Sequence, residues 1–255
     1  MNNKTISDSI INYLKKRNYQ HICLKTVMFD MDGVLFDSMK NHARCWNEAM
    51  AHYGLNLPPE EAYMHEGRTA TGTINIISLR ERGHEATEEE IKEIYAYKGM
   101  LFNQCPKAER MPGAYELLLK VKASGVTPMV VTGSGQKSLL ERLQTNFPSI
   151  FREELMVTAF DVKKGKPDPE PYLMGLKKAG NLHPYQSMVV ENAPLGVKAA
   201  VASGCFTIAV NTGPLPDSAL LEEGADILFP SMQALCDNWQ TLFQLLSAPP
   251  TPQHL

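Results

Sequence analysis

Two aspartates, Asp30 and Asp32, follow a short apolar run and are separated by one residue. Residues i and i+2 of an extended segment leave it on the same side, so the two carboxylates are expected to lie close together. Carboxylates at that separation repel each other unless a cation lies between them, and oxygen ligands of this kind suit Mg²⁺. On this motif alone, a helix-capping aspartate beside a turn aspartate is the alternative interpretation.

A second polar segment, Thr132-Gly133-Ser134-Gly135, also follows an apolar run. A hydroxyl and glycine-exposed amides at the start of a helix can bind a phosphate. The segment lacks the third glycine of a dinucleotide-binding fingerprint. The alternative interpretation is a plain turn between a strand and a helix.

Two further segments could contribute charge and oxygen ligands. Lys166 lies in a segment rich in proline, which would fix its backbone and allow the ammonium group to neutralise a phosphate. Glu191 and Asn192 follow an apolar run, so that their side-chain oxygens are expected at the end of a strand. Each segment also has an ordinary interpretation, as a surface lysine and as a helix cap.

The elements that would position these residues alternate along the chain. Apolar runs predict strands at 25–29, 126–131, 154–160, 187–190, 206–210 and 226–229, and amphipathic stretches predict helices at 114–124, 137–146, 169–179, 194–203 and 231–246. This alternation indicates a parallel sheet with helices on both faces. Ligands bind beyond the carboxyl ends of such strands, where all four polar segments are expected.

One region departs from the alternation. Helical spacing at 38–53, 71–82 and 87–104, without a convincing strand, predicts a helical domain inserted after the first strand. The predicted organisation is a helical N-terminal extension (1–24), a core (25–37 and 108–246), the inserted domain (38–107) and a C-terminal tail (247–255).

Composition narrows the partners and the compartment. A net charge of −3 gives no basic excess, so nucleic acid is not expected as a partner. No apolar stretch approaches the ~20 residues of a membrane span, and the N-terminus does not have the pattern of a signal peptide. Five cysteines without a CxxC pair favour free thiols in a reducing cytoplasm. Composition does not indicate an oligomeric state.

In their order and spacing, the four polar segments resemble the haloacid dehalogenase (HAD) superfamily of phosphohydrolases, over about residues 25–246. The resemblance implies a Rossmann-like parallel sheet core with a mobile helical cap inserted after the first strand. It implies Asp30 as a nucleophile that forms an aspartyl-phosphate, and Asp32 as the general acid and base. Thr132 would contact the phosphoryl oxygens together with Gly133 and Ser134, and Lys166 would balance the negative charge.

The resemblance also implies Mg²⁺ as the cofactor, held by Asp30, by the backbone carbonyl of Asp32 and by the segment containing Glu191 and Asn192. The family usually has a second acidic residue where this chain has Asn192, so the site loses one negative charge. Glu66, in the predicted cap, could supply the missing carboxylate. Candidates for contact with the substrate are Arg68, Lys98 and His42, each of which could instead be an ordinary surface or helix residue.

Two resemblances within the superfamily imply different substrates. His42 matches the histidine that follows the first motif in the β-phosphoglucomutase-like subfamily, but Ala70 stands where the mutase has a cap arginine. Segments 61–69, 128–135 and 191–196 are more similar to HAD inorganic pyrophosphatases of the Bacteroides type, which implies Glu66 as a magnesium ligand. Pyrophosphate is therefore the predicted substrate. The alternatives are a β-phosphoglucomutase and a phosphatase of small sugar phosphates, while the nucleophile–acid pair argues against a non-catalytic binding protein.

Overall fold

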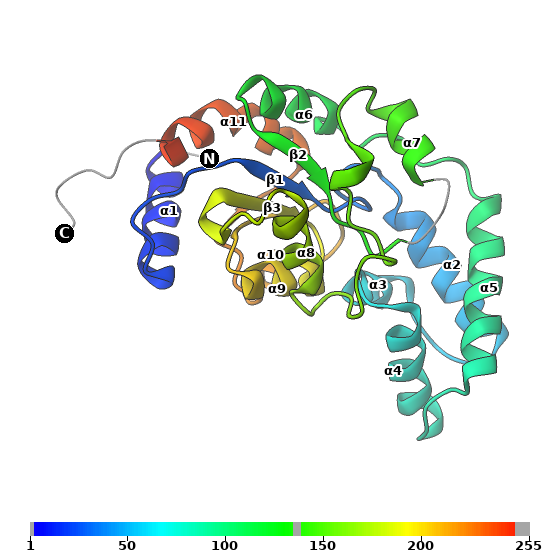
Figure 1. The fold of residues 1–255 in the computed structure, drawn as a ribbon. Helices are drawn as coiled ribbons and strands as arrows, with labels where there is room; N and C mark the ends of the chain where they lie inside the picture. Colours follow the sequence, from blue (N-terminus) through cyan, green and yellow to red (C-terminus); the bar gives the residue numbers. More distant parts are fainter. Residues whose placement is uncertain (1–2, 135–138, 248–255) are drawn as a thin grey trace.

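The computed structural model describes residues 3–134 and 139–247, and within them the chain forms a five-stranded parallel sheet (Figure 1). The strands are β1 (Thr26–Phe29), β2 (Thr127–Val130), β3 (Ser187–Glu191), β4 (Phe206–Val210) and β5 (Ile227–Phe229). They lie in the order β2-β1-β3-β4-β5. The expected parallel α/β fold is confirmed.

The register of the central strands explains where the site forms. Phe29 lies level with Val130 on one side and with Val190 on the other. The next residue along β1, Asp30, and the last residue of β3, Glu191, therefore emerge side by side at the carboxyl edge of the sheet.

Helices cover both faces of the sheet. The helices outside residues 30–113 are α1 (Asn3–Arg17), α6 (Ala114–Ala123), α7 (Leu139–Asn146), α8 (Glu170–Lys178), α9 (Pro194–Ser203), α10 (Asp217–Leu221) and α11 (Met232–Ser247). Val27 and Phe29 belong to a hydrophobic cluster with α1, α6 and α11, whereas Met28 belongs to a cluster with α8 and α9 (Figure 1). Successive side chains of β1 thus point to opposite faces, as in any strand.

The strand predicted at 154–160 does not form. Glu153–Leu155 is a short 3₁₀ helix (η2), and Val157 makes a single bridge with Val131. The segment then turns, because Asp161 accepts hydrogen bonds from the backbone N–H and the hydroxyl of Thr158. A second 3₁₀ helix, η3 (Pro184–Gln186), leads into β3.

The helices between β1 and α6 have a hydrophobic cluster of their own. They are α2 (Met39–His52), α3 (Pro59–Ala62), the 3₁₀ helix η1 (Tyr63–His65), α4 (Ala70–Arg82) and α5 (Glu88–Gln104). Their cluster includes Met50, Leu57, Ile74 and Ile94, and none of its members lies in the sheet. α2, α4 and α5 form where helical spacing predicts them, while α3 and η1 were not predicted.

The N-terminal helix α1 is docked on the sheet. Ile6, Ile10 and Tyr13 are buried, and Tyr13 makes an edge contact with the ring of Phe206. The described part of the chain contains no helix long and apolar enough to cross a bilayer. Gly135, the start of the helix predicted at 137–146, and residues 248–255 of the predicted tail lie outside the described residues.

Candidate active site

Asp30 lies at the carboxyl end of β1 and forms a buried ion pair with Lys166. Lys166 is 3% exposed, and its Nζ also lies 2.7 Å from Oε1 of Glu191. Burial alone would lower the pKa of Lys166, but the two carboxylates raise it above its usual value. Lys166 is therefore a fixed positive charge beside Asp30, as its predicted role requires.

Both carboxylate oxygens of Glu191 are engaged by neighbouring residues. Its Oε1 accepts hydrogen bonds from Lys166 and from the Tyr172 hydroxyl, the latter at 2.7 Å. Its Oε2 accepts from the backbone N–H groups of Asn192 and Ala193. With both oxygens engaged and no exposed surface, Glu191 holds Lys166 in place. These four contacts engage both carboxylate oxygens, so they do not favour Glu191 as a metal ligand, and that role stays a prediction.

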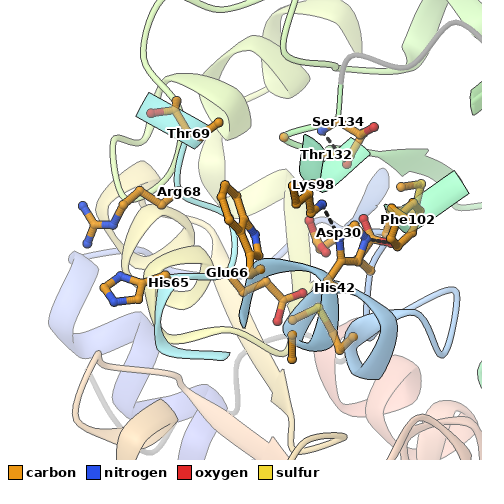
Figure 2. Close-up of a pocket in the computed structure, with 18 of the residues that line it drawn as sticks. Asp30, His42, His65, Glu66, Arg68, Thr69, Lys98, Phe102, Thr132 and Ser134 are labelled. Carbon is orange, nitrogen blue, oxygen red and sulfur yellow. Dashed lines mark hydrogen bonds and ion pairs between the residues drawn. The ribbon is translucent and has the colours of Figure 1, made fainter. Parts of the chain in front are cut away.

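Asp32 is held by α2 rather than by the sheet. Its Oδ1 accepts from the Ser38 hydroxyl at 2.5 Å and lies 3.4 Å from Nε2 of His42. Lys98, from α5, reaches Nδ1 of His42 at 2.9 Å. Phe102 stacks on the His42 ring (Figure 2). Lys98, His42 and Asp32 thus form a continuous chain of contacts from the helical segment to the core.

The two aspartates have pKa values displaced in opposite directions. Burial raises the pKa of Asp30 to about 7, with Glu191 and Asp32 adding repulsion and Lys166 opposing it. Burial also acts on Asp32, but His42 and Ser38 outweigh it and lower the pKa of that carboxyl below its usual value. A nucleophile must be ionised, so the predicted role of Asp30 requires additional positive charge beside it, which a divalent cation would supply.

Glu66 and Asn192 provide an observation that fits such a cation. Asn192 donates from Nδ2 to Oε2 of Glu66 at 3.1 Å, while Oε1 of Glu66 and Oδ1 of Asn192 are buried and have no hydrogen-bond partner among the described residues. Burial raises the pKa of Glu66 well above its usual value, and repulsion from Asp30, Glu191 and Asp32 raises it further. Two buried oxygens without donors, in a carboxylate-rich site, suit a hard cation such as Mg²⁺.

Carboxylates alone do not complete this site. Within residues 3–134 and 139–247, no three His, Cys, Asp or Glu side chains are grouped so that they could hold a metal ion. A cation here would therefore depend on the Asn192 amide, a backbone carbonyl and water as well. Gly33 is part of the same packing, because a Cβ there would lie 2.0 Å from Nδ2 of Asn192 and its φ is +83°.

The loop between η1 and α4 lies over the core residues. A Cβ added at Gly67 would lie 3.1 Å from Cδ of Lys166, and one at Gly165 would lie 3.1 Å from Cγ2 of Thr69. In Figure 2 the Glu66 carboxylate is directed toward Asp30 and His42. The Arg68 guanidinium instead points away from Asp30, on the side of His65. Arg68 lines the pocket, and its contact with the leaving group of a substrate stays a prediction.

The segment predicted to bind phosphate, Thr132 to Ser134, also lines the pocket. Thr132 is 4% exposed, and its Oγ1 accepts from the backbone N–H of Ser134 at 3.0 Å (Figure 2). Gly133 lines the same pocket. The structure thus brings together at one pocket the predicted residues Asp30, Asp32, His42, Glu66, Arg68, Lys98, Thr132, Gly133 and Ser134. Lys166 and Asn192 contact members of this set, and Glu191 contacts Lys166.

Several residues that line the pocket were not predicted, among them Arg142, Trp46 and Phe102. Arg142, from α7, places its guanidinium 3.8 Å from the centre of the Phe36 ring. Its Nη2 is buried and has no hydrogen-bond partner in the described part of the chain. Trp46 and Phe102 line the wall around Lys98. Trp46 could have been predicted, because it lies four residues after His42 and therefore on the same face of a helix. Arg142 lies in no recognisable motif.

Comparison with known proteins assigns the family. The sequence model of the family described as "Haloacid dehalogenase-like hydrolase" matches residues 27–210. Hexitol phosphatase A of Escherichia coli is 32% identical over 190 residues, covering 73% of this chain and 83% of that protein. Validoxylamine A 7'-phosphate phosphatase of Streptomyces hygroscopicus is 31% identical over 204 residues, covering 80% and 92%. The chain belongs to the haloacid dehalogenase-like hydrolase family.

A solved structure extends the likeness to nearly the whole chain. A Bacteroides vulgatus protein, provisionally described as a β-phosphoglucomutase, is 62% identical with a TM-score of 0.94. The match covers 97% of this chain and 100% of that one. These relatives support the predicted β-phosphoglucomutase-like subfamily.

Proposed function

We propose that the chain is a Mg²⁺-dependent phosphatase in which Asp30 is the nucleophile and the substrate is a small phosphorylated compound. The observation that carries this proposal is the buried contact of Asp30 with Lys166, with Asp32 and Thr132 at the same pocket. Phosphoryl transfer depends mainly on positioning and on charge neutralisation, and this arrangement supports both.

The residues divide the reaction into two steps. An Asp30 carboxylate oxygen attacks phosphorus, the bond to the leaving oxygen breaks, and protonated Asp32 donates its proton to that oxygen. Because His42 and Ser38 lower the pKa of Asp32 in the absence of substrate, this step requires the negative charge of the bound phosphate to raise that pKa. Asp32 then takes a proton from water, whose oxygen attacks phosphorus and breaks the bond to Asp30. Thr132 contacts the phosphoryl oxygens, and Lys166 balances their charge in both steps. Mg²⁺, held by Asp30, the Asp32 carbonyl, Asn192 and Glu66, would supply further neutralisation.

The relatives favour a sugar or polyol phosphate as the substrate. Their names include a hexitol phosphatase and a fructose-1-phosphate phosphatase. None of the relatives described above is named as a pyrophosphatase, so our sequence-based preference for pyrophosphate is not supported by them. In this proposal, residues 38–107 act as a cap that closes over the substrate and selects its leaving group.

Pyrophosphate is kept as a second candidate because of Glu66. Its carboxylate lies against Asn192 in the space above the core, where it would compete with a sugar for room. A compact leaving group such as phosphate would tolerate a carboxylate there, especially with a cation between them.

The deciding experiment is a comparison of kcat/KM for hexitol phosphates, hexose phosphates and pyrophosphate in the presence of Mg²⁺, together with an assay for conversion of β-glucose 1-phosphate to glucose 6-phosphate. We expect the best sugar or polyol phosphate to exceed pyrophosphate by at least about tenfold. The reverse order would establish the second candidate, and conversion without net hydrolysis would establish a mutase. Asp30→Asn should lower every activity by about 10³-fold or more; activity at the wild-type level would disprove the mechanism.

Glu66→Gln tests the metal-ligand role separately. We expect weaker Mg²⁺ binding by calorimetry and a higher Mg²⁺ requirement, about tenfold each, because a ligand charge is lost. Glu60→Gln, an exposed residue nearby, is the matched control and should change neither. Equal Mg²⁺ affinity in Glu66→Gln and the wild type would remove Glu66 from the metal site.

A further inference from the structure

Two cysteine side chains meet between the long helices of the cap. Cys45 lies in α2, and Cys105 follows the last residue of α5. Their Sγ atoms are 3.5 Å apart, although the residues are 60 positions apart in the sequence. A disulfide requires the sulfurs to approach by roughly a further 1.5 Å.

The two thiols differ in access and in electrostatic surroundings. Cys45 has no exposed surface, whereas Cys105 is partly exposed. Nη2 of Arg44 lies 3.1 Å from Sγ of Cys105. Thiolates are the species that attack disulfides, and a guanidinium is placed beside the partly exposed sulfur of the pair. Cys105 is thus the thiol that a reagent in solution would meet first.

The backbone at Cys105 permits the remaining approach. Cys105 is the residue that caps α5, with φ −68° and ψ 151°, and its backbone N–H donates to the carbonyl of Phe102 in the last turn. On the α2 side, Asn41 donates to the backbone oxygen of Pro106 at 3.2 Å, which keeps this segment next to α2. A small backbone rotation at the end of α5 would therefore bring the two Sγ atoms to bonding distance without a movement of α2.

We propose that Cys45 and Cys105 form a reversible disulfide that joins α2 to the end of α5, with a small disulfide such as oxidised glutathione as the oxidant. The Cys105 thiolate attacks one sulfur of oxidised glutathione, which gives a mixed disulfide and releases one glutathione thiolate. Cys45 loses its proton and attacks Sγ of Cys105, which releases the second glutathione. Two protein thiols are oxidised, and one glutathione disulfide is reduced to two thiols.

The disulfide would affect the pocket because the two helices that it joins also contain His42 and Lys98. His42 lies one turn before Cys45 on α2, and Lys98 lies two turns before Cys105 on α5. The disulfide fixes the separation of the helices that make the His42–Lys98 contact. Burial raises the pKa of Cys45 to about 11, so ring closure is expected to be faster at pH 8.5 than at pH 7.

The test uses the reduced full-length protein incubated with oxidised glutathione at pH 8.5. We expect the thiols titrated after denaturation to fall from five to three, a peptide linking Cys45 to Cys105, and a higher Tm that dithiothreitol reverses. Cys45→Ser and Cys45→Ala should stop with one glutathione on Cys105, and Cys105→Ser should take up no glutathione at Cys45. Cys236→Ser, a buried control in α11, should still form the disulfide.

Five titratable thiols after incubation of the wild type, or a mixed disulfide that persists on Cys105, would overturn the proposal. A linked peptide that contains another cysteine would overturn it as well. All of these readouts are independent of catalysis, so they hold whichever substrate the pocket takes.

Discussion

At the scale of single residues, the pocket holds more positive charge on its core side than local motifs indicate. Thr132 and Lys166 were predicted because each lies in a short segment with an obvious chemical use. Arg142 was missed because nothing next to it in the sequence suggests a site; only the packing of α7 brings it to Phe36 and to the pocket. Arg68 was predicted from its position beside Gly67 as a contact for the leaving group; it lines the pocket with its guanidinium on the side away from Asp30.

Arg142 should contribute to binding of an anionic substrate. Its buried Nη2 lacks a hydrogen-bond partner among the described residues, and its charge lowers the pKa of Asp32. We expect Arg142→Met, which keeps the length of the side chain and removes the charge, to raise KM about tenfold, equivalent to ~1.4 kcal/mol. Steady-state kinetics would measure this, with Arg142→Lys retaining most of the affinity. An unchanged KM in Arg142→Met would mean that the guanidinium only packs on Phe36.

At the scale of elements, apolar pattern predicted the strands that lie in the sheet and the long helices. The prediction of a strand at 154–160 was wrong, because a short apolar run does not reveal how many of its residues can pair with a neighbouring strand. Here the Thr158–Asp161 turn ends the pairing after Val157. The role of Glu191 was also beyond prediction, because its partners Lys166 and Tyr172 come from a distant loop and helix.

The approach of α9 to β3 depends on Gly196. A Cβ there would lie 1.9 Å from Oε1 of Glu191. We expect Gly196→Ala to lower the free energy of unfolding by about 1–3 kcal/mol through overpacking, and to lower kcat because Glu191 would no longer hold Lys166. Urea unfolding and steady-state assays measure the two effects.

Gly99→Ala is the matched control for this substitution. Gly99 is also helical, but in the described part of the chain an added Cβ would have no atom within 4 Å apart from its chain neighbours and the backbone of its own helix. The Gly99→Ala substitution should stabilise the protein by about 0.5–1 kcal/mol, because alanine favours a helix more than glycine does. If both variants lost the same stability, steric contact with Glu191 would not be the cause.

At the scale of the whole molecule, α1 is an integral part of the fold. Ile6 has no exposed surface, and none of the residues that line the pocket lies in α1. Ile6→Ala is expected to cost about 2 kcal/mol of unfolding free energy, at the lower end for a buried isoleucine because the helix is terminal. The value of kcat/KM should not change. Asn12→Ala, on the exposed side of α1, serves as the control, and equal stability of the two variants would show that α1 is not docked in solution.

The hydrophobic clusters under the sheet and within helices α2 to α5 share no residues. A substitution among Met50, Leu57 or Ile74 can therefore reshape the roof of the pocket while Asp30, Lys166 and Glu191 keep their contacts. Substitutions at distant sites that share no contacts usually have additive effects on the free energy of unfolding. Over evolutionary time, such separation lets substrate preference drift while the phosphate chemistry is retained. The differing substrate names of relatives that match most of this chain are what that independence would produce.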